Sequence, residues 1–218
     1  MDEEFWLTRW EKNDIGFHKA EPHRFVLRFF DSLRVRPGDT FFVPLCGKSQ
    51  DLVWLRARDL RVVGIELSRM AVEAFAIENE LRGIWQDEAG MLCYVADGYK
   101  LFCGNFFELT AVHLDGVCGV YDRGALVAMP PEMRACYVQH LTGLLPSGTR
   151  VLLISYAYDQ IETCGPPFSV PMEEIKVLFE EYCQIELLVS EDSLRSHQGL
   201  AARGVTQLSE FAVLLRRY

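Results

Sequence analysis

Two short segments in the first third of the chain carry the clearest chemical signal: the turn at 47–49 and the acidic end of the apolar run 61–66. Glu66 ends the apolar run 61–66 and stands 19 positions after Gly47, which follows the apolar run 40–43. An acid at the end of a second strand, about 20 residues beyond the first turn, is placed to accept hydrogen bonds from two ribose hydroxyls. A ribose-bearing cofactor is therefore predicted, and NAD, FAD and S-adenosylmethionine all carry the required diol. An ordinary acid before a helix is the alternative.

The turn Gly47-Lys48-Ser49 resembles two phosphate-binding motifs but matches neither of them. A P-loop needs a second glycine five positions before Gly47, where this chain has Phe42. The dinucleotide fingerprint needs three glycines where this turn has one. The turn thus lacks the glycines that would let its backbone bind a pyrophosphate. This disfavours a nucleotide triphosphatase and a nicotinamide-dependent oxidoreductase as the class of this protein. A ligand without phosphates can still approach past Gly47, and Lys48 is interpreted as a solvated surface residue.

Two later segments offer groups for the rest of such a ligand. Asn105 can hydrogen-bond the edge of an adenine ring and Phe106 can stack on its face, with core packing as the alternative for Phe106. Arg123 follows the next apolar run and can bind a carboxylate, with Asp122 holding it in place. A purely structural ion pair between Asp122 and Arg123 is the alternative.

These residues need a scaffold that brings the ends of distant strands together. Apolar runs predict strands at 40–43, 61–66, 91–95, 100–103, 116–121, 150–156, 185–189 and 211–215. Helices are predicted at 50–58, 69–81, 130–144 and 171–182, and the first 33 residues are predicted to be mostly helical. Alternating strands and helices predict an α/β fold with a doubly wound, mostly parallel sheet. The last two strands, with no helix between them, predict an antiparallel hairpin at one edge, and ligands are expected at the carboxyl ends of the strands.

Charge and composition limit the partners. The chain has 218 residues, and 22 Lys+Arg against 31 Asp+Glu give a formal net charge of −9. No run of Lys and Arg exceeds two residues, which argues against a nucleic acid or an anionic membrane surface as the partner. No window approaches about 18 apolar residues and the acidic start lacks a secretion signal, so a soluble cytoplasmic protein is expected. The seven cysteines and five histidines lack metal-binding spacing, so no metal is predicted.

Six further segments occur together and in order. They are Trp6-x-x-Arg9-Trp10, Ile15-Gly16-Phe17-His18, FVPLCGK at 42–48, VGIE at 63–66, DRGALVA at 122–128 and GPPF at 165–168. Together they resemble the thiopurine S-methyltransferase family, and specifically its bacterial branch, over nearly the whole chain. The resemblance implies a class I, Rossmann-like methyltransferase that uses S-adenosylmethionine. It also implies one domain over 1–218, in which residues 1–33 form a helical lid.

The resemblance implies roles for individual residues. Cofactor contacts are expected from Trp10, Leu45, Glu66, Asn105, Phe106 and Arg123, beside the turn at Gly47. Phe17 is expected in the lid over cofactor and substrate, and Arg123 near the substrate entrance. A further arginine of the last third is expected near the substrate, where Arg203 is preferred to Arg195.

Methyl transfer from a sulfonium to a thiolate needs orientation and exclusion of water more than an acid–base pair. Asp14 and His18 in the lid loop are the alternative proton acceptors for a less acidic thiol. The resemblance implies a monomer that acts on small aromatic or heterocyclic thiols such as thiopurines, and on selenium or tellurium species in detoxification. A nicotinamide-dependent oxidoreductase and a non-catalytic ligand-binding protein on this scaffold are the competing classes.

Overall fold

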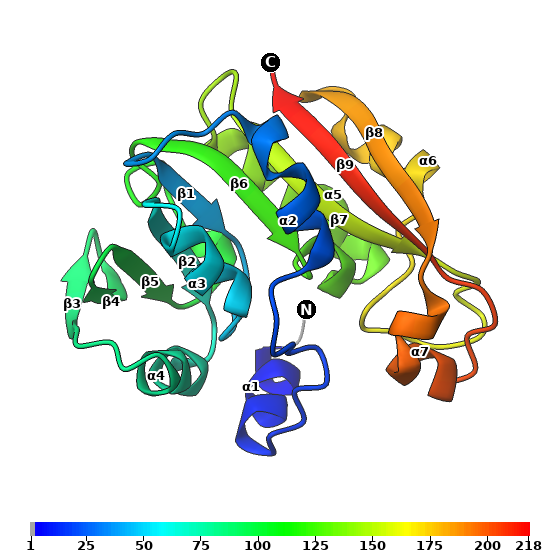
Figure 1. Cartoon of the computed structure of the whole chain (residues 1–218), viewed down its shortest axis with the longest axis horizontal. Helices are drawn as coiled ribbons and strands as arrows, with labels where there is room; N and C mark the ends of the chain where they lie inside the picture. Colours follow the sequence, from blue (N-terminus) through cyan, green and yellow to red (C-terminus); the bar gives the residue numbers. More distant parts are fainter. Residues whose placement is uncertain (1–2) are drawn as a thin grey trace.

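The eight apolar runs of the chain and one further, more polar segment assemble into a nine-stranded sheet. The computed structural model describes residues 3–218, and Figure 1 shows the sheet crossing the molecule between helices. The strands are β1 (Thr40–Val43), β2 (Arg61–Glu66), β3 (Ile84–Glu88), β4 (Met91–Ala96), β5 (Tyr99–Cys103), β6 (Val117–Arg123), β7 (Arg150–Ala157), β8 (Cys183–Asp192) and β9 (Ser209–Arg217). Their spatial order is β3-β4-β5-β2-β1-β6-β7-β9-β8.

The centre of this sheet is parallel and both edges are antiparallel. The strands β5, β2, β1, β6 and β7 pair in parallel, with Phe42 opposite Val63 on one side and Val120 on the other. The strand β9 runs antiparallel to β7 and pairs with β8, which confirms the antiparallel pair predicted at that edge. The expectation that no helix lies between these strands is wrong, because the short helix α7 (Gln198–Ala202) connects them. At the other edge β4 runs antiparallel to β5, and β3, for which no strand was predicted, extends the sheet. The predicted doubly wound α/β fold is confirmed.

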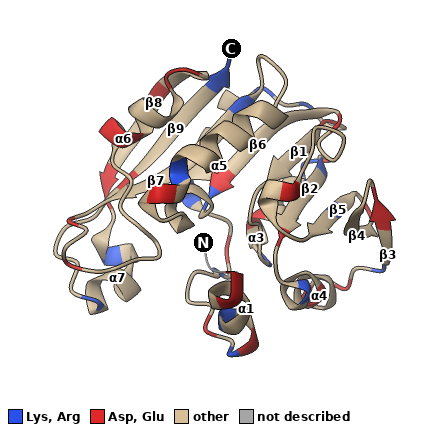
Figure 2. Ribbon diagram, turned by 180° about the vertical axis from the view of Figure 1, so that it is seen from behind, with Lys and Arg blue, Asp and Glu red and all other residues tan. Residues whose placement is uncertain are grey.

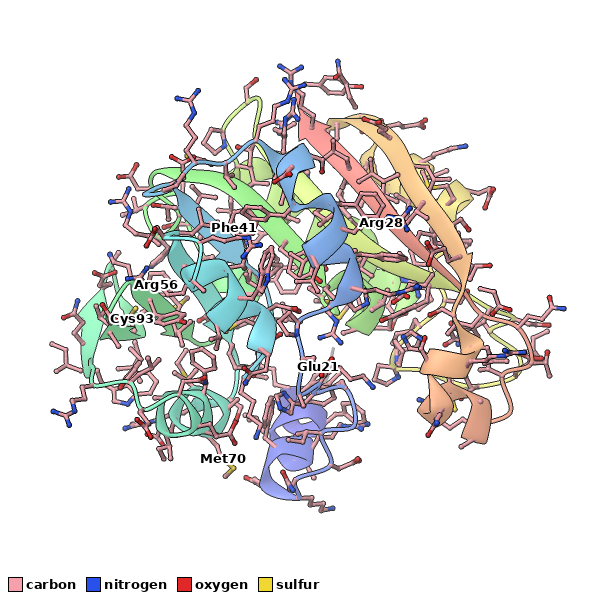
Figure 3. The ribbon with its side chains drawn as sticks, in the orientation of Figure 1. Glu21, Arg28, Phe41, Arg56, Met70 and Cys93 are labelled. Atoms are coloured by element: carbon pink, nitrogen blue, oxygen red, sulfur yellow. The ribbon has the colours of Figure 1, made fainter. Side chains whose placement is uncertain are left out.

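Helices cover both faces because successive strand residues point to opposite sides. The helices are α1 (Glu3–Glu11), α2 (Arg24–Phe29), α3 (Gln50–Arg56), α4 (Arg69–Glu78), α5 (Pro131–Leu144), α6 (Met172–Phe179) and α7 (Gln198–Ala202). Phe41, labelled in Figure 3, is buried in one core with residues of α2, α3 and α4. Its neighbour Phe42 is buried in the second core with residues of α5 and α6. Figure 2 shows α5 and α6 in front of the sheet from this second side.

The N-terminal segment divides into two parts. In Figure 1, α1 lies beyond the carboxyl ends of β1 and β6, and it packs against α4. Trp10 is its buried residue. The following helix α2 instead packs on the sheet, with Phe25 and Val26 fully buried. Of the segment predicted as a lid, α1 and the loop after it are therefore the part that faces the strand ends. Over residues 3–218, no helix is long and apolar enough to cross a membrane.

Candidate active site

A cavity of about 500 Å³ opens at the carboxyl ends of the central strands, under α1. Its lining includes Trp10, Asp14, Phe17, His18, Leu45, Gly47, Glu66, Asn105, Phe106, Arg123 and Arg203. The structure thus brings together every residue preferred for the site from the sequence, while the competing Arg195 is outside this lining and exposed. In the part of the chain from 3 to 218, no group of three or more His, Cys, Asp or Glu side chains can hold a metal ion.

Glu66 stands at the end of β2 with its carboxylate held by the backbone. Its Oε2 accepts a hydrogen bond from the Gly47 N–H at 2.9 Å, and its Oε1 accepts one from the Ser68 N–H at 2.8 Å. Burial raises the pKa of Glu66 to about 6, although these backbone N–H groups favour the charged form. Each carboxylate oxygen has a second lone pair, so the group can accept further hydrogen bonds from a ligand.

The turn between β1 and α3 requires a glycine beside this carboxylate. Gly47 has φ of +51°, which disfavours other residues, and a Cβ there would lie 3.3 Å from Cζ2 of Trp10. The tryptophan ring can therefore close on the turn because the side chain is absent. Leu45 also has a positive φ of 46°, a conformation that costs about 1 kcal/mol or more outside glycine. The turn that predicted the cofactor site is thus held in an unusual backbone conformation.

Aromatic rings of the N-terminal segment pack on one another at the mouth of the cavity. Phe17 lies edge-on to Trp10 at 5.5 Å and to Trp6 at 5.7 Å between ring centroids. Arg9 lies 5.8 Å from the centroid of Phe17 and binds the Asp14 carboxylate at 3.2 Å. Asp14 is thus engaged in an exposed ion pair. This cluster places an apolar cover next to the strand ends.

His18 and Lys48 bring titratable nitrogens to the same cavity. Burial lowers the pKa of His18, and the positive charge of Lys48 lowers it further. Lys48 binds Glu78 of α4 at 2.5 Å, and its side chain is only 13% exposed. The interpretation of Lys48 as a solvated surface residue is therefore wrong, because α4 supplies an acid that holds it against the cavity wall. His18 is consequently favoured in its neutral form near neutral pH.

Arg123 is held by different partners from the one that the sequence suggested. Its Nη1 lies 3.7 Å from Oδ2 of Asp51, in the first turn of α3, and its charge interacts with the side chain of Tyr156 on β7. Asp122 instead binds the Tyr137 hydroxyl at 2.7 Å and accepts from the backbone of the turn after β6. The predicted pairing of Asp122 with Arg123 is wrong. The strand β6 continues through both residues, so their side chains point to opposite faces.

Asn105 and Phe106 line the cavity beyond β5, with their side chains already in use. The Asn105 Oδ1 accepts from the Phe107 N–H at 2.9 Å, and its Nδ2 donates to Glu3 of α1 at 2.7 Å. The ring of Phe106 packs against Tyr137, at 4.9 Å between centroids, within the core. Most of the Phe106 ring is therefore packed in the core, as the alternative interpretation of this residue predicted. Asn105 also ties α1 to the sheet.

Arg203 and several residues without a sequence signal form the remaining wall. Arg203 donates to Oγ1 of Thr163 at 3.0 Å and to the Pro166 carbonyl at 2.9 Å. The wall further includes Met129, Met133, Tyr156, Pro166, Pro167, His197 and Leu200. Tyr156 ends a predicted strand, so the rule that ligands bind at strand ends would have found it. His197 and Met129 come from connecting segments and Met133 from the first turn of α5, and none of them carries a comparable signal.

Solved structures share this fold. The 1,6-didemethyltoxoflavin-N1-methyltransferase of Burkholderia thailandensis, crystallised with 1,6-didemethyltoxoflavin and S-adenosylhomocysteine, aligns with a TM-score of 0.64 at 14% identity. The alignment covers 99% of this chain and 86% of that one. An S-adenosylmethionine-dependent methyltransferase from Anabaena variabilis aligns with a TM-score of 0.63 at 18% identity, over 99% and 95% of the two chains. The architecture is that of the class I S-adenosylmethionine-dependent methyltransferases.

Sequence comparison narrows this class to one family. The family model described as Thiopurine S-methyltransferase (TPMT) matches residues 1–218. The thiopurine S-methyltransferase of Nitrosospira multiformis is 44% identical over 217 residues, covering 99% of this chain and 98% of that protein. That of Pseudomonas aeruginosa strain UCBPP-PA14 is 42% identical and covers 100% of both. The chain belongs to the thiopurine S-methyltransferase family. It is a methyltransferase, and its cofactor is S-adenosylmethionine.

Proposed function

We propose that this enzyme transfers the methyl group of S-adenosylmethionine to the sulfur of small aromatic or heterocyclic thiols, with thiopurines as the type. The observation that carries the proposal is that Glu66 and Arg123 line one cavity, covered by Trp10 and Phe17. A hydrogen-bond acceptor, a cation and an apolar cover are the groups that a ribose, an amino-acid carboxylate and a reacting sulfur require.

The cavity residues fit the cofactor. The free lone pairs of Glu66 would accept the two ribose hydroxyls, and Arg123 would bind the methionine carboxylate. Leu45 and Gly47 would lie along the cofactor, because the glycine leaves room beside the carboxylate. Asn105 and Phe106 remain the predicted neighbours of adenine. Since both side chains already have partners, we propose that they shape this pocket more than they bind the base.

Transfer is favoured by exclusion of water. S-adenosylmethionine supplies a methyl group on a positively charged sulfur, and transfer to a thiolate removes both charges. Such a reaction proceeds faster when water no longer solvates the reactants. We propose that Trp10 and Phe17 exclude that water. An aromatic thiol is largely ionised near neutral pH, and for a less acidic thiol His18 is the better proton acceptor. Its neutral imidazole has a free lone pair, whereas Asp14 is held by Arg9.

The acceptor is proposed to bind on the other side of the cavity. Met129, Met133 and Leu200 give this wall an apolar surface, and Arg203 adds a positive charge. A polarisable anion fits such a surface. This wall therefore supports thiolates as acceptors and, as a further proposal, selenium or tellurium anions that the enzyme would methylate in detoxification. A cavity of about 500 Å³ suits a small molecule and supports no macromolecular substrate. A monomer in the cytoplasm, without nucleic acid or membrane as partner, stays a prediction.

Methyl transfer with a labelled cofactor tests this proposal. The purified chain is incubated with methyl-labelled S-adenosylmethionine and an aromatic thiol, and the label is followed into the thioether. We expect turnover with the thiol, and none with the corresponding ring hydroxyl as the matched acceptor. Transfer to the hydroxyl alone, or binding of the cofactor with no transfer to any thiol or chalcogen anion, would overturn the proposal.

A further inference from the structure

Glu210 is a fully buried carboxylate on β9 that the proposed chemistry does not use. Its Oε1 lies 3.0 Å from Nε2 of His23, and its Oε2 accepts from Arg24 at 2.7 Å and from the Ser193 hydroxyl at 2.9 Å. Nε2 of His197 lies 3.7 Å from the same carboxylate. Burial would raise the pKa of Glu210, but the hydrogen bonds from His23 and Arg24 outweigh it and lower the pKa to about 2. The group is therefore an anion at any physiological pH.

One set of contacts leads from Glu210 to Arg123 through the start of α2. His23 caps this helix, and its Nδ1 accepts from the Phe25 N–H. Its Nε2 therefore carries the proton that faces Glu210. The backbone N–H of His23 donates to Oδ1 of Asp51 at 2.7 Å, and Oδ2 of Asp51 faces Arg123 at 3.7 Å. Fixing His23 thus fixes the carboxylate that pairs with Arg123.

A second set of contacts leads to Arg123 from the opposite side. His197 lies in the wall of the cavity, and its Nδ1 is 2.9 Å from the Ser193 carbonyl. Its ring meets Tyr156 edge-on at 5.1 Å between centroids. The Tyr156 side chain in turn interacts electrostatically with the Arg123 guanidinium. Two independent sets of contacts therefore start at Glu210 and end at one guanidinium.

We propose that Glu210 is a positioning residue that orients Arg123 in the cavity through His23–Asp51 on one side and His197–Tyr156 on the other. This inference rests on the role proposed for Arg123 above. Asp51 is too distant, at 3.7 Å, to make a short bidentate ion pair, so the guanidinium depends on its other restraints. A side chain held loosely by about 1 Å loses much of its catalytic value, which is why such supporting contacts matter.

A double-mutant cycle separates positioning from stability. The substitutions are Glu210→Gln and Arg123→Ala, alone and together, and the readouts are the Kd of S-adenosylmethionine by calorimetry and kcat/KM for an aromatic thiol. We expect Glu210→Gln to worsen one or both of these constants about tenfold in the parent chain, and by no more than about twofold when Arg123 is already alanine. Equal losses in both backgrounds would show a merely structural role and overturn the inference.

The single variant of Arg123 tests the proposed function separately. If Arg123→Ala leaves both constants unchanged, the role of Arg123 fails and the inference fails with it. If Arg123→Ala is defective but the cycle is additive, only the inference fails. If Glu210→Gln does not fold, Tyr156→Phe serves instead, because it removes the hydroxyl that interacts with Arg123 without removing a buried charge. A smaller loss, about threefold, that disappears in the Arg123→Ala background is then expected, and additive losses again overturn the inference.

Glu191→Gln is the matched control. Glu191 is opposite Glu210 on the neighbouring strand β8 and binds the same Arg24, at 2.5 Å, together with Arg28 at 2.6 Å. Figure 3 labels Arg28 on α2. A negative charge is thus removed beside the same helix, but among residues 3–218 no hydrogen bond or ion pair joins Glu191 to His23, His197 or Asp51. Both constants should stay within about twofold of the parent values, and a loss as large as that of Glu210→Gln would contradict the proposed route.

Discussion

The two walls of the cavity are built in different ways. On the wall proposed for the cofactor, Glu66 is fixed by N–H groups of its own loop and of the turn after β1. On the opposite wall, where Arg123 is proposed to bind the methionine carboxylate next to the acceptor, this guanidinium is held by side chains from α3 and β7, which in turn depend on Glu210 of β9. The first wall follows from two adjacent strand–turn units, and the second requires most of the fold.

The comparison predicts that the two walls respond differently to substitution. Because backbone donors hold Glu66, a change there should act on cofactor binding and leave the neighbouring segments in place. The wall around Arg123 is a network of side chains, so a change there should spread to the partners of the altered residue. Four expected effects, taken from the largest to the smallest, test whether the walls are separable in this sense.

The largest effect is expected from Glu66→Ala. Two ribose hydrogen bonds to a carboxylate contribute roughly 2–4 kcal/mol, so the Kd of S-adenosylmethionine should rise at least about 30-fold. Calorimetric titration measures this change. Glu73→Ala on the outer side of α4, where the residue pairs with Arg69, is the control and should bind like the parent chain. Unchanged affinity in Glu66→Ala would remove this carboxylate from the site and with it the basis of the comparison.

The pH dependence of cofactor binding should be the next largest effect. With the pKa of Glu66 raised to about 6 by burial, about a tenth of the free protein is ionised at this position near pH 5. If ribose binding needs the anion, only the ionised fraction of the protein binds the cofactor. The apparent Kd should then rise about tenfold as the pH is lowered from 7 to 5. Glu66→Gln should bind weakly and with little dependence on pH. Titrations across this range, run in parallel on both proteins, measure the difference.

Stability should show the opposite dependence on pH. A buried carboxyl with a raised pKa keeps its proton between about pH 4.5 and 6, while the unfolded chain loses it. The contribution of this group to the free energy of unfolding therefore falls as the pH rises through that window. Asp122, whose pKa burial also raises to about 6, contributes to this loss but lies outside the cavity lining. Asp122→Asn should thus flatten the stability profile while keeping the pH dependence of binding, and loss of both would contradict the assignment to Glu66.

Much of the fold and of the first wall could be predicted because the signals are local. The strands β1 and β2 have the predicted bounds, and the acid and the glycine follow from their position after these strands. The strand β3 was missed because Trp85, Gln86 and Asp87 do not resemble a buried strand. It lies at the edge of the sheet, where polar residues are tolerated.

The second wall could not be predicted because its partners are distant in the sequence. Adjacent residues suggested that Asp122 holds Arg123, yet a strand that continues by two residues sends them to opposite faces. Nothing near Arg123 in the sequence indicates Asp51, Tyr156 or Glu210, since these meet only when three other elements have packed. Family motifs did place Arg203 at the cavity, because they carry information about the fold that spacing lacks.

The smallest effect is expected at Arg203, which tests the independence of the walls. Its guanidinium binds a hydroxyl and a carbonyl and, among residues 3–218, has no carboxylate within 4.0 Å, so its charge remains available to an anionic acceptor. The side chain lies at the exposed mouth, where water and salt weaken such attraction. Arg203→Ala should therefore raise the acceptor KM only about threefold, with the cofactor Kd unchanged. Arg195→Ala, outside the lining, should leave both constants unchanged. A weaker cofactor Kd in Arg203→Ala would mean that Arg203, like Arg123, supports the cofactor, and that the two walls form one network.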